Sequence, residues 1–371
     1  MRKTTILALI CVSLYALCGC WDYRGINELD LAVGIAIDKS DGKYELVIEV
    51  INIPAQGEKD SARAVFVESE GETVFEAVRN TKKKLEGVLY LGNLQTLIIG
   101  RDVAENEDIH TVISGFIRNG EPCETTKVVI AEGSAREIIL SKGLDSRSVS
   151  AEISRIVENG DAYASPSKHA SLYETYNLPD SPRQRLILPV FLSTVNNGET
   201  IVELSGSAYF DGGKLAGFLN PEDTRVCLMI TDELNGGVLT LDMDARRKIT
   251  FNINKCVTKR DFSFQDERFT VGVKIGLELD VTDMPTGEFF SSRSELECWA
   301  AEEIRRNTRD FLARFRRETG IDIFGFGGMV YRCEPRLWEL HDWDEMFRDA
   351  EIDVEVTVKI RDLGIINELQ E

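Results

Sequence analysis

Two segments of this 371-residue sequence contain residue types that bind phosphate or metal ions in other proteins. The run DIFGFGG at residues 322–328 is rich in glycine, but it lacks the Gly-Lys-Ser/Thr ending that holds phosphate and magnesium in a phosphate loop. His341 and Glu345 would share one face of a helix, yet no second histidine lies near them. We therefore expect a turn with glycine at positive φ in the first segment and a solvated helix in the second. Neither segment predicts catalytic residues or metal ligands.

The overall composition excludes several classes of function. Hydrophobic residues make up 43% of the chain and charged residues 29%, which is typical of a folded globular protein. The formal net charge is −20, whereas a nucleic-acid-binding protein needs a basic surface. The chain has three histidines and no G-x-S-x-G motif, so its sequence predicts neither a histidine-rich metal site nor a hydrolase of that kind.

The strongest chemical signal lies in the first twenty residues. Arg2 and Lys3 precede an apolar run at residues 6–17, which is too short to span a membrane as a helix and indicates a signal peptide. The sequence LCGC at residues 17–20 then resembles the lipobox of bacterial lipoproteins. Its small residues would let the extended chain enter the signal peptidase, and the thiol of Cys20 would be the nucleophile that takes a diacylglycerol.

This interpretation predicts cleavage between Gly19 and Cys20, so that residues 1–19 form the signal peptide. The covalent diacylglycerol on Cys20 is the only cofactor-like group expected. Two acyl chains give a stable membrane anchor, whereas a single acyl chain gives only weak, reversible membrane binding. Residues 21–371 would then form an ectodomain on the extracytoplasmic side of the membrane. The alternative is an ordinary cleaved signal peptide followed by an incidental cysteine.

Five cysteines remain after cleavage, without any C-x-x-C pair, so zinc binding and thioredoxin-like chemistry are not expected. Buried free thiols are one interpretation and one or two disulfides are the other. These residues are Cys123, Cys227, Cys256, Cys298 and Cys333.

The hydrophobic pattern predicts a mixed α/β (α+β) ectodomain of two to three domains with mixed or antiparallel sheets and packed helices. Residues 31–37 form a continuous apolar run that predicts a strand buried on both faces. In the first half, further strands and helices alternate. Residues 203–219 predict a hairpin around the turn at 211–213, and strands are expected at 225–231, 237–241, 248–257, 269–279 and 352–360. We place one domain at residues 20–190 and a second at 200–367.

One long helix is expected at residues 292–318 and a short helix at 338–347. The solvent face of the long helix is rich in arginine, which reverses the local charge in an acidic chain and could steer a partner. The alternative is a solvated face with Glu302–Arg306 and Asp310–Arg314 ion pairs. The residues expected to bind a partner are Arg305, Arg306, Arg309 and Arg316.

Several segments, in colinear order, resemble the Ger(x)C family, the C subunits of spore germinant receptors. The opening segments are CWDYR at 20–24, INEL at 26–29 and VGIAID at 33–38. LYLGNLQ at 89–95 followed by IIG at 98–100 resembles the family's LYLGHL segment, with Asn93 where histidine is common. The later segments are GSAYF at 206–210, KLAG at 214–217, and DIFGFG at 322–327 with Pro335 and Trp338.

The resemblance implies a non-catalytic, lipid-anchored receptor subunit that takes part in nutrient-triggered germination. Its partners would be a family A subunit and a permease-like B subunit in the spore inner membrane. The resemblance identifies no residue that contacts the nutrient and leaves open whether this subunit contacts it directly or indirectly. Cys20 is the one residue of this sequence to which the resemblance assigns a role, that of the lipidated cysteine.

The alternative function is a lipid-anchored solute-binding protein of a transporter, for which two similar lobes would be expected. The sequence halves differ, which favours the receptor subunit. A surface hydrolase is the third hypothesis. A cleft with converging polar groups would favour the solute-binding protein or the hydrolase.

Overall fold

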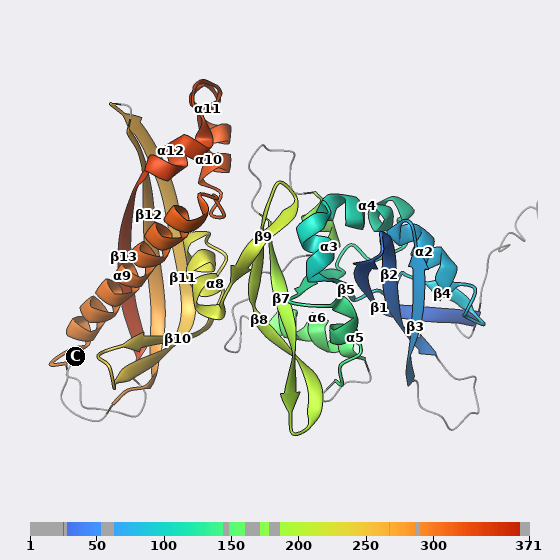
Figure 1. Ribbon diagram of the computed structural model, residues 1–371. Helices are drawn as coiled ribbons and strands as arrows, with labels where there is room; N and C mark the ends of the chain where they lie inside the picture. Colours follow the sequence, from blue (N-terminus) through green and yellow to red (C-terminus); the bar gives the residue numbers. More distant parts are fainter. Residues whose placement is uncertain are drawn as a thin grey trace, which may run out of the picture.

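A computed structural model describes residues 25, 28–52, 63–143, 148–159, 171–177, 186–266, 268–285 and 290–363. The described residues form two β-sheets with helices packed on them, so the expected mixed α/β fold is confirmed (Figure 1). The predicted signal peptide, Gly19 and Cys20 lie outside the described residues.

The first sheet has the strand order β3-β2-β1-β5-β6-β7-β8-β9, with β4 paired to the start of β1. Its centre is parallel, because β1, β5, β6 and β7 run in the same direction. The strands are β1 (Leu29–Ser40), β2 (Lys43–Asn52), β3 (Arg63–Gly71), β4 (Val88–Tyr90), β5 (Thr96–Ile99), β6 (Lys127–Ala131), β7 (Ile187–Asn196), β8 (Glu199–Asp211) and β9 (Lys214–Leu219).

Helices cover both faces of this sheet, which explains why its central strands are apolar throughout. Within β1, Ala32, Val33, Ile35, Ala36 and Ile37 are at most 1% exposed, as the sequence predicts. One face carries α5 (Ala135–Ile139) and α6 (Val149–Asn159). The other carries α2 (Val74–Thr81), α3 (Arg101–Asn106), α4 (Ile109–Asn119) and α7 (Leu172–Tyr176).

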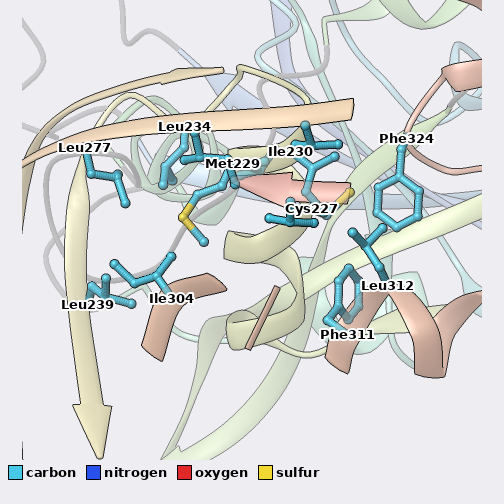
Figure 2. Close-up of a cluster of buried hydrophobic side chains, with 14 of the residues drawn as sticks. Cys227, Met229, Ile230, Leu234, Leu239, Leu277, Ile304, Phe311, Leu312 and Phe324 are labelled. Atoms are coloured by element: carbon cyan, nitrogen blue, oxygen red, sulfur yellow. The ribbon is translucent and has the colours of Figure 1, made fainter. Parts of the chain in front are cut away.

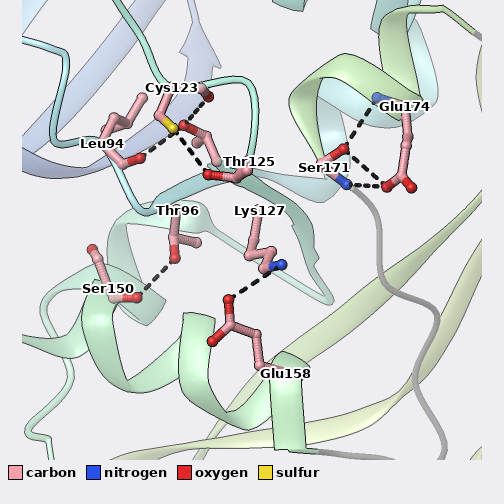
Figure 3. A network of polar contacts seen from close by, with 10 residues as sticks. Leu94, Thr96, Cys123, Thr125, Lys127, Ser150, Glu158, Ser171 and Glu174 are labelled. Carbon is pink, nitrogen blue, oxygen red and sulfur yellow. Dashed lines mark hydrogen bonds and ion pairs between the residues drawn. The ribbon is translucent and has the colours of Figure 1, made fainter.

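Polar contacts fix the helices to this sheet (Figure 3). The hydroxyl of Thr96 on β5 donates to the carbonyl of Ser150 on α6 at 2.7 Å. Ser171 and Glu174 form a reciprocal capping box at the start of α7. Helix α6 is thus held to the sheet by a side chain–backbone bond as well as by apolar packing, and the capping box stabilises the start of α7 itself.

The second sheet has the order β10-β11-β12-β13, antiparallel except for the parallel pair β12–β13. The long helix α9 crosses one face of it and packs on β13 (Figure 1). The strands are β10 (Gly237–Asp242), β11 (Lys248–Gln265), β12 (Arg268–Asp283) and β13 (Glu351–Asp362); the helices are α8 (Pro221–Ile230), α9 (Arg293–Thr319), α10 (Phe326–Cys333), α11 (Pro335–Leu340) and α12 (Trp343–Asp349).

Two expected elements were wrong. The strand expected at 225–231 is part of helix α8, which begins because Asn220 accepts the N–H of Asp223 and Pro221 occupies the first turn. The single helix expected at 338–347 is two helices, α11 and α12, and Asp342 starts the second by accepting the N–H groups of Asp344 and Glu345.

The hairpin predicted around residues 211–213 is confirmed, since β8 and β9 pair through Asp211 and Lys214. Gly212 and Gly213 take φ values of 55° and 83°, which a two-residue hairpin turn requires. These strands belong to the first sheet, which continues to Leu219. The two sheets therefore divide later in the chain than the domain limits of 190 and 200 expected from the sequence.

Candidate partner-binding site on helix α9

Helix α9 carries the arginines that the sequence predicts to bind a partner. Ser292 caps its start by accepting the N–H of Glu295, and Gly320 ends it at a φ of 67°. One face of the helix is buried against the second sheet, so the arginines are left on its outer sides. The buried residues are Leu296, Ala300, Glu303, Ile304, Thr308, Phe311, Leu312 and Phe315.

Three of the four arginines lie together. Helical geometry places Arg305, Arg309 and Arg316 within about 40° of one another around the helix axis. Arg316 donates to the carbonyl of Ala350, directly before β13. Arg309 and Arg316 also line a shallow hollow of about 170 Å³ whose other walls include Ile352 of β13. We call Arg305, Arg309 and Arg316 the arginine stripe.

Arg306 does not belong to the stripe. It lies about 100° around the axis from Arg305 and lines a different hollow, next to α8 and β10. Its guanidinium pairs with Glu303. The structure therefore separates one of the four predicted partner-binding residues from the other three.

The ion pairs on this helix differ from those expected at i,i+4 spacing. Arg305 pairs with Glu302 at 2.6 Å, and Arg306 pairs with Glu303, both at i,i+3. The hydrogen bond from Arg305 lowers the pKa of Glu302. Arg314 reaches Asp223 on helix α8 at 2.5 Å, so this side chain joins two helices.

A larger cleft of about 590 Å³ lies on the other side of α9, between α8, α9 and β10. Its apolar lining includes Met229, Leu239, Ile304 and Phe311, which belong to a cluster of buried side chains (Figure 2), and the partly exposed Val226 and Val238. Arg225 also lines it. The hydrophobic pattern does not reveal this cleft, because it predicts a strand at residues 225–231. The NPED sequence at 220–223 is the local signal for the start of helix α8, which forms one wall of the cleft.

The glycine-rich segment is a structural turn. Gly325 has a φ of 76°, as expected, and α10 begins at the next residue. The buried carboxylate of Asp322 accepts the N–H groups of Phe324, Gly325 and Gly327 at 3.0, 3.0 and 2.7 Å. Burial raises the pKa of Asp322. Its carboxylate therefore stabilises the turn by accepting backbone N–H groups along it.

His341 and Glu345 do not share a helix face. His341 lies between α11 and α12, with its ring 4.9 Å from that of Phe264, whereas Glu345 is in the first turn of α12. Within the described part of the chain, no three His, Cys, Asp or Glu side chains are grouped so that they could hold a metal ion.

The five cysteines are free thiols, but they are not uniformly buried. Only Cys227 is buried, Cys256 is half-buried, and Cys123, Cys298 and Cys333 are exposed. The expectation of buried thiols is thus correct for one residue and wrong for the three exposed ones.

Two family descriptions match the chain one after the other. "Spore germination protein N-terminal domain" matches residues 22–192, and "Spore germination B3/GerAC like, C-terminal" matches residues 205–364. The chain belongs to the Ger(x)C family of spore germination proteins.

Individual Ger(x)C relatives match the chain from end to end. Spore germination protein B3 of Bacillus subtilis (strain 168) is 23% identical over 99% of this chain and 100% of that protein. Spore germination protein KC of the same organism is 21% identical over 99% and 97%. The crystal structure of the GerBC protein has the same fold, with a TM-score of 0.57 and 18% identity over 91% of this chain and 99% of that one.

The described helices of this Ger(x)C protein include none that is both long enough and apolar enough to cross a membrane. The gap between the two family matches, at residues 193–204, falls within β7 and β8, whereas the first sheet extends to Leu219. The second family match therefore begins on the last two strands of the first sheet.

Proposed function

We propose that this Ger(x)C protein is the lipid-anchored C subunit of a spore germinant receptor and that it acts without catalysis. The observation that carries the proposal is the consecutive match of both family descriptions, over residues 22–192 and 205–364. The lipobox-like sequence at residues 17–20 supports a diacylglycerol anchor on Cys20. The ectodomain would then lie on the extracytoplasmic face of the spore inner membrane.

The proposed role is assembly with the A and B subunits of the receptor, with indirect contact to the nutrient. The arginine stripe is the surface that we propose for this contact, because its positive charge contrasts with the net charge of −20. The two halves of the chain carry sheets of different size and topology. This difference supports a receptor subunit over a solute-binding protein with two similar lobes.

The proposal is tested by nutrient-triggered germination in spores that lack all other germinant receptors. Spores with the native protein are compared with a full deletion and with Cys20→Ala, and the amount of protein is measured in each. We expect no germination in the deletion and a strong reduction in Cys20→Ala. Normal germination in the deletion would overturn the proposal, because no other receptor remains to replace this one.

A further inference from the structure

The cleft between α8, α9 and β10 contains a cation for which the described part of the chain provides no ion-pair partner. Arg225 projects from the middle of α8 into this cleft and is half-buried. Among the described residues, no carboxylate lies within ion-pair distance of its guanidinium. Burial lowers the pKa of Arg225 from its ordinary value, and the nearby charge of Glu222 offsets this only in part.

The other three basic residues of the cleft have partners. Lys248 pairs with Asp242 at 2.9 Å, Arg314 pairs with Asp223 at 2.5 Å, and Arg306 pairs with Glu303. Among these four basic residues, Arg225 is therefore the one whose guanidinium N–H groups have no carboxylate partner among the described residues. A guanidinium offers two parallel N–H donors, which match the two oxygens of a carboxylate.

The rest of the lining limits what such a ligand can be. Val226 and Val238 line the cleft as partly exposed apolar side chains, whereas the lining residues Met229, Leu239, Ile304 and Phe311 are almost fully buried. Glu222 and Asp310 also line the cleft, and their negative charges repel a multiply charged anion such as phosphate. A volume of about 590 Å³ is within the usual range of small-molecule sites.

We infer that this cleft binds a small monocarboxylate with an apolar body, whose carboxylate forms a bidentate ion pair with Arg225 and whose hydrocarbon part packs on Val226 and Val238. Binding of such a ligand would need neither the lipid anchor nor the partner subunits of the proposed assembly function.

The test is isothermal titration calorimetry on the full chain in detergent, with hexanoate as the probe and hexanamide and inorganic phosphate as comparisons. Hexanoate is expected to bind saturably in the millimolar range. Hexanamide, which has the same apolar body without the charge, is expected to bind about tenfold more weakly or not at all, and phosphate is expected not to bind. Equal binding of hexanoate and hexanamide would overturn the inference, and so would absence of hexanoate binding.

The variant Arg225→Gln is expected to weaken hexanoate binding by about tenfold or more. The matched control is Arg317→Gln, which removes an exposed arginine of α9 that does not line the cleft and is expected to leave hexanoate binding unchanged. Should Arg225→Gln fail to fold, Arg225→Lys decides the question, because it keeps the charge but loses the bidentate fork. Unchanged affinity in a folded Arg225 variant contradicts the inference.

Discussion

The ring of Phe315 on α9 meets the ring of Tyr209 on β8 edge to face, with the ring centroids 5.1 Å apart and the planes at 74°. The contact joins the first sheet to the long helix of the second unit. Leu219 of β9 and Cys227 of α8 belong to the same apolar cluster. The two sheets therefore share part of one core, and these four residues all lie within the second family match at residues 205–364.

This shared core predicts that Phe315→Ala destabilises the protein. The substitution removes a ring that is 5% exposed and also contacts Phe311 and Phe324, so we expect the free energy of unfolding to fall by about 3–5 kcal/mol. Urea unfolding followed by circular dichroism measures this change. Tyr209→Phe keeps the edge-to-face contact and is expected to cost less than about 1 kcal/mol. A loss below about 1 kcal/mol for Phe315→Ala would show that the contact does not stabilise the fold.

Glu49 provides a second long-range contact that can be tested. Its carboxylate is fully buried and accepts the N–H groups of Val149 and Ser150 at 3.1 and 3.0 Å, at the start of α6. Glu49→Ala would leave both N–H groups buried without an acceptor, so we expect a loss of about 2–4 kcal/mol. Glu49→Gln keeps one acceptor oxygen and is expected to cost less.

Amide hydrogen exchange gives a local readout of the same contact. Glu49→Ala is expected to speed exchange in the first turn of α6 more than exchange in α9, which it does not contact. Equal stability of Glu49→Ala and the native protein, with unchanged exchange in α6, would contradict this role for the carboxylate.

The free cysteines are expected to react with iodoacetamide at different rates. Thr125 hydrogen-bonds to the exposed thiol of Cys123 at 2.9 Å and lowers its pKa (Figure 3), so more of this thiol is in the reactive thiolate form near neutral pH. Burial raises the pKa of Cys256 to about 11, so this thiol stays protonated up to strongly alkaline pH. Mass spectrometry at pH 7.5 should therefore find Cys123 alkylated well before Cys256.

Thr125→Val tests the cause of this order. Loss of the hydroxyl is expected to slow alkylation of Cys123 by about threefold and to leave the exposed Cys298 and Cys333 unaffected. If Cys123 reacts at the same rate with and without the hydroxyl, the hydrogen bond does not control its pKa.

The arginine stripe is tested by reversing one charge. Arg309→Glu is expected to reduce the amount of A and B subunits recovered with the protein by about fivefold. The positive stripe would attract a negatively charged partner surface, and the substitution replaces part of this attraction with repulsion. Arg317→Glu makes the same change on another side of α9 and should have little effect. Equal recovery with both variants would remove the stripe from the proposed interface.

Local sequence patterns predict those helices, strands and turns whose conformation depends mainly on neighbouring residues in the chain. The apolar run in β1, the two-glycine turn after Asp211 and the helix that starts at Ser292 each carry their signal within a few residues. Helix α8 was misread because its apolar residues Val226–Ile230 resemble a buried strand, and only the capping residues before them reveal the helix.

The long-range contacts could not be predicted in this way. Glu49 and Ser150 are 101 residues apart, and Tyr209 and Phe315 meet only because β8 and α9 pack together. The same holds for the cleft, because Arg225 looks like an ordinary surface residue in the sequence. Its place in the cleft depends on the packing of α8 beside α9 and β10.

The central claim is that this protein is a subunit of a membrane receptor. It is tested most directly by purifying a tagged full-length protein from detergent-solubilised spore inner membranes and quantifying the recovered proteins by mass spectrometry, with an untagged strain as the control. We predict enrichment of one A subunit and one B subunit of the germinant receptor type, together with a diacylglycerol-modified Cys20 at the N-terminus of the purified protein. Enrichment of a transporter permease without any receptor subunit would contradict the account and favour a solute-binding protein instead.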